Sequence, residues 1–78
     1  MNSIQELNTA VLRLVKLKIK LGMSGSSIYN KLNPSSRYFD PTFPKPIKLG
    51  ASAVGWIEAE IDEWILSCVK ASRPETIE

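Results

Sequence analysis

Histidine is absent from the chain, and cysteine occurs only once, at Cys68. A single cysteine cannot form an intramolecular disulfide, and without histidine the sequence offers no ligand set for a zinc site. The commonest general base of enzymes is also missing, and no serine has an activating partner visible in the sequence. We therefore expect neither an enzyme nor a metal or cofactor site. Because free cysteines are usually buried, we expect Cys68 to be a small core residue.

Long apolar runs are missing as well. No stretch approaches the roughly 20 consecutive apolar residues that cross a membrane, and the first residues lack the basic start and apolar core of a signal peptide. We expect a cytoplasmic protein with no membrane partner. Seventy-eight residues suffice for one domain with a small core. We place it at 11–72, between a tail or short helix at 1–10, where Ser3 and Glu6 have capping-box spacing, and a C-terminal tail at 73–78.

The small net charge of +2 hides an uneven distribution. Eight of the ten lysines and arginines lie between residues 13 and 48, where Asp40 is the only acidic residue. Six of the eight acidic residues lie after position 57. A basic middle region beside an acidic C-terminal helix predicts one cationic face, which attracts polyanions such as nucleic acid. The same lysines could serve only to keep a small domain soluble, and charge alone does not separate these interpretations.

The stretch from Gly22 to Leu32 has the pattern of a helix-turn-helix. Gly22 can close a preceding helix in the left-handed conformation, and Ser24 can cap a second helix that runs to Leu32. Ile28 and Leu32 would place that helix against the core. The other side chains resemble those of a helix that enters the DNA major groove: Ser26, Ser27, Asn30 and Lys31. The pattern also fits an ordinary helical hairpin whose polar face is solvated.

Residues 14–21 carry two conflicting patterns. Apolar and lysine residues alternate strictly from Val15 to Leu21, which predicts a half-buried strand. Leu14, Leu17 and Leu21 instead have helical spacing, and both leucine and lysine favour helices. The residues by themselves leave the choice between strand and helix open.

Turn-forming residues and prolines dominate the middle of the chain. Pro34 ends the second helix, and we expect Tyr38 and Phe39 to anchor the following loop in the core. The prolines of residues 43–46 enforce an extended backbone. A β-hairpin that leans on the helices is then predicted from two short strands, Ile47–Leu49 and Ala53–Trp56, joined by a turn at 50–52.

The last helix has the clearest pattern. Apolar residues recur on one helical face: Ile57, Ile61, Trp64, Ile65 and Cys68. Acidic residues crowd its start and basic residues follow its end, and both placements suit the helix dipole. Together with the earlier segments, this helix completes the predicted core: Ile28, Leu32, Phe43, Trp56, Ile61 and Trp64.

Three motifs follow one another in a fixed order: Gly22-Met23-Ser24-x-Ser26-x-Ile28-Tyr29, then Phe43-Pro44-x-Pro46-Ile47-Lys48-Leu49-Gly50, then Trp56 with Glu60-Ile61 and Trp64. This ordered set, over about residues 11–70, resembles the AlpA-type family of small phage and prophage regulators. It is more distantly similar to phage excisionases and the DNA-binding heads of MerR-type regulators. The resemblance implies a winged helix-turn-helix, mainly α with a small β-hairpin. It makes residues 14–21 the first helix, 11–13 a short extended lead-in, 24–32 the recognition helix and 47–56 the wing.

The resemblance also implies which residues contact DNA. From the recognition helix, the major groove would be faced by Ser24, Ser26, Ser27 and Asn30. Tyr29 would pack through its ring and reach a phosphate through its hydroxyl, and Lys31 would contact a phosphate. From the wing, phosphates would be contacted by Lys45 and Lys48, and the minor groove approached by Gly50 and Ser52. Further phosphate contacts are expected from Lys16, Lys18, Lys20 and Arg37.

The chain departs from the family pattern where members often carry arginine, at Gly25, Ser52 and Ile57. Arginine is the strongest reader of bases and narrow grooves, so one copy is expected to bind double-stranded DNA weakly and to self-associate cooperatively on repeated sites. The implied function is control of an integrase gene or an accessory role in excision. The alternative is a protein-binding adaptor that meets a basic partner through an acidic helix face: Glu58, Asp62 and Glu63.

Overall fold

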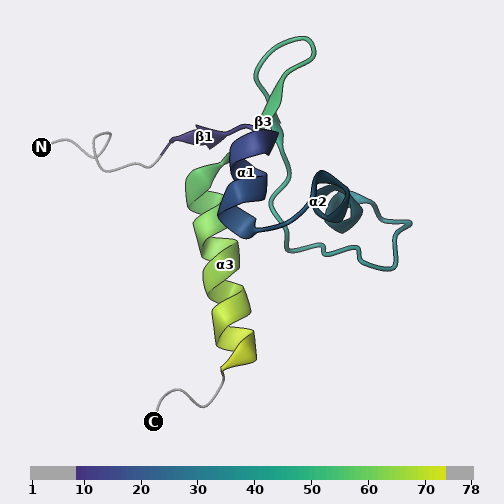
Figure 1. The fold of residues 1–78 in the computed structure, drawn as a ribbon, viewed down its shortest axis with the longest axis vertical. Coiled ribbons are helices and arrows are strands. Elements are labelled where there is room, and N and C mark those ends of the chain that lie inside the picture. Colours follow the sequence, from purple (N-terminus) through teal and green to yellow (C-terminus); the bar gives the residue numbers. More distant parts are fainter. Residues whose placement is uncertain (1–8, 74–78) are drawn as a thin grey trace, which may run out of the picture.

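The computed structural model describes residues 9–73, which form three helices and three short strands. The elements are β1 (Val11–Leu12), α1 (Leu14–Leu21), α2 (Gly25–Leu32), β2 (Ile47–Lys48), β3 (Val54–Ile57) and α3 (Glu58–Ser72) (Figure 1). The predicted fold class is confirmed: the chain is a winged helix-turn-helix, mainly α with a small β wing. The predicted capping box at Ser3 and Glu6 and the tail from Pro74 lie outside the described residues.

Residues 14–21 form a helix, which settles the conflict between the two patterns. Leu17 is fully buried, while Val15 and Ile19, which created the strand-like alternation, are 66% and 73% exposed. The helix ends at Gly22, whose φ of 66° lies in the left-handed region. The N–H groups of Gly22 and Met23 both donate to the Lys18 carbonyl, at 2.8 and 3.1 Å. The Lys18 carbonyl thus accepts two hydrogen bonds at the end of the helix, and the left-handed Gly22 turns the chain toward α2.

The three strands form an antiparallel sheet in the order β1-β3-β2. Ile47 and Lys48 pair with Gly55 and Val54 to form the predicted hairpin. On its other edge, β3 pairs Trp56 with Leu12 of β1, so the lead-in segment is a third strand rather than only extended chain. The sheet thus links the start of the domain to the hairpin, and α3 begins directly after β3. No helix among residues 9–73 is long and apolar enough to cross a membrane.

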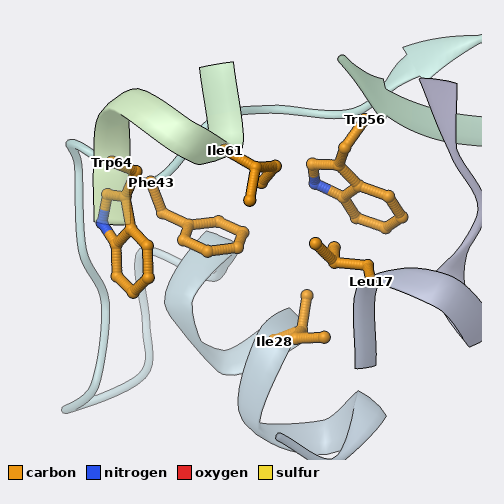
Figure 2. Close-up of a cluster of buried hydrophobic side chains, with 6 residues drawn as sticks. All are labelled: Leu17, Ile28, Phe43, Trp56, Ile61 and Trp64. Carbon is orange, nitrogen blue, oxygen red and sulfur yellow. The ribbon is translucent and has the colours of Figure 1, made fainter. Parts of the chain in front are cut away.

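Six buried side chains form the core: Leu17, Ile28, Phe43, Trp56, Ile61 and Trp64. Figure 2 shows Ile61 at the centre, with Phe43 and Trp64 on one side and Trp56 and Leu17 on the other. The rings of Phe43 and Trp64 meet edge to face with centroids 4.9 Å apart, a favourable aromatic geometry. Five of the six predicted core residues are therefore buried, and Leu32 is partly buried and packs against them. Among described contacts, the Trp56 indole N–H has no partner, a cost that burial of its ring outweighs.

Two core predictions are wrong. Cys68 is exposed because the last part of α3, from Leu66 onward, has no buried residue and extends past the core. Tyr38 and Phe39 are 61% and 40% exposed. They do not anchor their loop because Phe43, only four residues later, occupies the core in that place.

Candidate nucleic-acid interface

The start of α2 is fixed by a serine cap. Ser24 is the N-cap, with extended backbone angles, and its Oγ accepts a hydrogen bond from the Ser27 N–H at 3.1 Å. The Ser24 hydroxyl in turn donates to the Ser27 hydroxyl at 3.1 Å. The helix therefore begins at Gly25, directly after the predicted cap, and two of the predicted groove-facing hydroxyls already contact each other. Both serines remain exposed, as does the helix N-terminus that attracts phosphate groups.

The polar face of α2 lies opposite its anchor in the core. Ile28 is fully buried, whereas Ser26 and Ser27 are exposed and Asn30 is partly exposed. The Tyr29 ring packs edge-on against Trp56, with centroids 6.2 Å apart, yet 45% of the residue is exposed. The predicted packing of Tyr29 is thus observed, and contact between its hydroxyl and a phosphate stays a prediction.

Lys31 follows Ser27 by four positions, one turn further along α2, where the helix meets α3. It follows the buried Ile28 by three positions and is only partly exposed. Its Nζ lies 5.4 Å from the centroid of the Trp64 ring, in the geometry of a cation–π contact. Lys31 is therefore part of the junction between α2 and α3. This contact explains why Lys31 is less exposed than Ser26 and Ser27.

The hairpin between β2 and β3 projects from the sheet as the wing (Figure 1). The Leu49 N–H donates to the Ala53 carbonyl at 2.7 Å and closes the turn. The predicted wing residues are all exposed: Lys45, Lys48, Gly50 and Ser52. No atom lies within 4 Å of a Cβ built on Gly50, so the wing tip is open to a partner.

The lysines of α1 separate into two groups. Lys16 and Lys18 are exposed. Lys20 instead forms ion pairs across to α3, with its Nζ 2.8 Å from Glu58 and 2.9 Å from Asp62. The hydrogen bonds to Asp62 and Glu58 raise the pKa of Lys20 above its ordinary value. Lys20 thus joins two helices, and within residues 9–73 it is the predicted phosphate contact whose charge is balanced by ion pairs.

The acidic face of α3 is divided by the same contacts. Glu58 and Asp62 pair with Lys20, whereas Glu63 lines a shallow surface hollow together with Glu60 and Trp64. Of the three carboxylates proposed for an adaptor, two therefore already pair with α1, and Glu63 does not.

Asp40 positions the loop after α2, a role that the sequence analysis missed. Its Oδ1 accepts hydrogen bonds from the Thr42 N–H and hydroxyl at 2.9 and 2.6 Å, and its Oδ2 accepts one from the Trp64 indole at 3.1 Å. These bonds, the one from the Thr42 hydroxyl most of all, lower the pKa of Asp40. The available signal was the sequence Asp40-Pro41-Thr42, since aspartate often caps a turn two residues onward.

Two comparisons with known proteins bear on this arrangement. The family model described as "Prophage CP4-57 regulatory protein (AlpA)" matches residues 10–69. The chain is also 54% identical over 55 residues to a protein of Escherichia coli (strain K12) named "DNA-binding transcriptional activator AlpA". That alignment covers 70% of this chain and 79% of the relative. No solved structure matches the chain.

Proposed function

Because this chain belongs to the AlpA family of prophage regulatory proteins, we propose that it is a sequence-specific DNA-binding regulator of transcription. The observation that carries the proposal is the exposed pair of elements, α2 with its capped N-terminus and the wing with its two lysines. A winged helix-turn-helix with these features fits a major groove and its flanking phosphates. The name of the Escherichia coli relative supports the same activity. Such a regulator acts on DNA in the cytoplasm.

In this proposal α2 enters the major groove and the wing contacts the adjacent minor groove. Ser26 and Asn30 approach the bases, and asparagine can pair with adenine through two hydrogen bonds. Ser24, Ser27 and Tyr29 contact the backbone near the helix start. Phosphates are bound by five exposed cations, which position the protein without reading sequence: Lys16, Lys18, Arg37, Lys45 and Lys48. Lys20 is left out because it pairs with two carboxylates of α3, and Lys31 because it is only partly exposed where α2 meets α3.

Few residues of this surface read bases strongly, and this supports cooperative assembly on repeated sites. The family resemblance leads us to expect arginine at Gly25, Ser52 and Ile57, and none of the three is charged. A Cβ on Gly25 would lie 3.6 Å from the Leu14 side chain, an ordinary contact, so packing does not require glycine there. A single module of this kind buries only about 600–1,000 Å² on DNA. We therefore propose that several copies bind side by side to reach useful affinity.

Salt titration of DNA binding tests the proposal. We expect one fragment from the neighbourhood of the gene to be retained over random competitor DNA. Five phosphate contacts predict a slope of log affinity against log salt of about −4 to −5. The double variant Ser26→Ala/Asn30→Ala should lose the preference for that fragment but keep the slope, because it removes base contacts only. If the protein does not bind DNA even at low salt, the proposal is wrong.

The biological output is proposed as control of an integrase gene or as an accessory role in excision. A reporter fused to the integrase promoter measures the first role, and an assay of prophage excision in which integrase comes from an independent promoter measures the second. A regulator of the gene alone changes only the reporter, whereas an excision factor changes excision at constant integrase.

A further inference from the structure

The loop between Asn33 and Asp40 leaves α2 and returns to it. Asn33 is the C-cap of α2, and the Asp40 N–H donates to the carbonyl of Lys31, in the last turn of that helix, at 2.9 Å. Both ends of the loop are therefore fixed at the C-terminal end of the proposed recognition helix. In Figure 1 the loop extends beyond α2 on the side opposite α1. The tip of this loop therefore lies near the C-terminal end of α2.

Local hydrogen bonds give the loop a defined shape. The Ser35 N–H donates to the Asn33 side chain at 2.9 Å, and the Ser36 N–H donates to the Asn33 carbonyl at 2.9 Å. Ser36 then accepts twice, through its Oγ from the Tyr38 N–H at 3.0 Å and through its carbonyl from the Phe39 N–H at 3.1 Å. A segment ordered in this way loses little entropy when it binds a partner.

The tip presents a cation stacked on an exposed ring. The Arg37 guanidinium carbon lies 5.4 Å from the centroid of the Tyr38 ring, within the range of a cation–π contact. Tyr38 is 61% exposed, so the pair faces solvent. The carboxylate of the loop, Asp40, binds Thr42 and Trp64 instead, and no described carboxylate forms an ion pair with Arg37. The tip therefore carries an unbalanced positive charge.

We propose that Arg37 and Tyr38 form a third DNA-contacting element, which binds a backbone phosphate next to the groove that α2 occupies. The inference rests on the proposed function and adds to it a preformed phosphate clamp on the loop. A guanidinium can donate two parallel hydrogen bonds to one phosphate, and the tyrosine hydroxyl can donate another. Tyr38 acts mainly as a positioning residue, because its ring holds the guanidinium in place. Charge complementarity and continuity with α2 favour DNA over a protein partner for this surface.

A double-mutant cycle on DNA binding tests the clamp. Arg37→Ala should weaken affinity about threefold to tenfold and reduce the steepness of the salt slope by about 0.9, the value of one phosphate contact. Tyr38→Ala should weaken binding through the same contact, so the double variant should be little worse than Arg37→Ala. Tyr38→Phe retains the ring and should recover most of the loss. Lys70→Ala, which removes an exposed charge from α3, and Phe39→Ala, which removes a neighbouring exposed ring, should leave both affinity and slope unchanged.

The outcomes separate this inference from the proposed function. If the unmodified protein does not bind DNA, both fail. If it binds DNA but Arg37→Ala changes neither affinity nor slope, the clamp is overturned and Arg37 is removed from the proposed phosphate contacts, while DNA binding through α2 and the wing still stands. A weaker affinity with an unchanged slope also overturns it, because the lost contact is then not to a phosphate. Additive effects of the two substitutions contradict the positioning role of Tyr38. Circular dichroism of each variant checks folding, which we expect to be unaffected because both side chains are exposed.

Discussion

At the scale of single residues, Gly55 is the position with the least room. It is buried in the central strand β3, and a Cβ built there would lie 2.5 Å from the Val11 side chain and 3.1 Å from the Leu12 carbonyl oxygen. The absence of a side chain is what lets β1 approach β3. We predict that Gly55→Ala lowers the free energy of unfolding by about 1–3 kcal/mol, the usual cost of overpacking, as measured by urea denaturation.

Gly50 supplies the matched control. It lies in the wing turn, has a negative φ, and has no atom within 4 Å of a built Cβ. Gly50→Ala should therefore leave stability unchanged or raise it by a few tenths of a kcal/mol by restricting the unfolded chain. Equal losses for the two variants would show that close contact is not the reason for glycine at position 55.

At the scale of elements, Asp40 joins the loop after α2 to the helix α3. Its carboxylate accepts three hydrogen bonds, from two groups of Thr42 and from Trp64. We predict that Asp40→Ala lowers the free energy of unfolding by about 1–3 kcal/mol, because it leaves the partly buried Trp64 indole N–H without an acceptor. Asp40→Asn keeps the shape of the side chain and should cost less. Thermal denaturation of the three proteins at neutral pH measures both effects.

The same hydrogen bonds predict a pH dependence. They hold the pKa of Asp40 below its ordinary value of 3.8, so the folded protein binds the proton more weakly than the unfolded chain. The resulting stabilisation is fully present above pH 3.8 and is lost as the pH falls through the lower, folded-state pKa. The stability difference between the unmodified protein and Asp40→Asn should therefore shrink below about pH 4. A difference that stays constant down to pH 2 would contradict this assignment.

At the scale of the whole molecule, different cations serve stability and the proposed DNA binding. Lys20 pairs with Glu58 and Asp62 and thereby joins α1 to α3, whereas Lys48 is exposed on the wing. We predict that Lys20→Gln lowers Tm and leaves DNA affinity nearly unchanged. Lys48→Gln should leave Tm unchanged and weaken DNA binding, with a shallower salt slope. Calorimetry and fluorescence anisotropy on the same samples measure the two quantities.

If Lys20→Gln and Lys48→Gln each changed both Tm and DNA affinity, the separation of cations into stabilising and DNA-binding ones would be wrong. Glu58→Gln, which removes one of the two carboxylates that pair with Lys20, is an informative companion. It should lower Tm less than Lys20→Gln, because Asp62 still pairs with the lysine, and it should not weaken DNA binding. These effects should diminish in high salt, since exposed charges are screened there.

Local patterns in the sequence predicted most elements correctly. Gly22 closes α1, Ser24 caps α2, and the spacing of Ile28, Ile61 and Trp64 identifies their buried faces. Such signals involve residues within one or two helical turns of each other, so they can be recognised without knowledge of the fold. Family resemblance then added the helix at 14–21, and the structure confirms it.

The tertiary structure alone decided features that depend on distant residues. Lys20 meets Glu58 across 38 positions, and this contact turns a predicted phosphate ligand into a link between helices. Cys68 has apolar spacing on α3 but is exposed, because periodicity identifies a helix face and not how far a neighbouring element covers it.

The sequence by itself therefore determined α2 and α3, the turn, the hairpin and the polar composition of α2, because each depends on backbone preferences and neighbours within a few residues. For residues 14–21 the local patterns conflicted, and burial of Leu17 in the tertiary structure goes with the helix. Only the tertiary structure decided which cations stay exposed, that β1 completes the sheet, and that Arg37 and Tyr38 face solvent beside α2. Those outcomes depend on contacts between residues that are far apart in the chain. Phe43 and Trp64 occupy the core beside the loop between α2 and β2, and the other aromatic residues of that loop, Tyr38 and Phe39, are exposed.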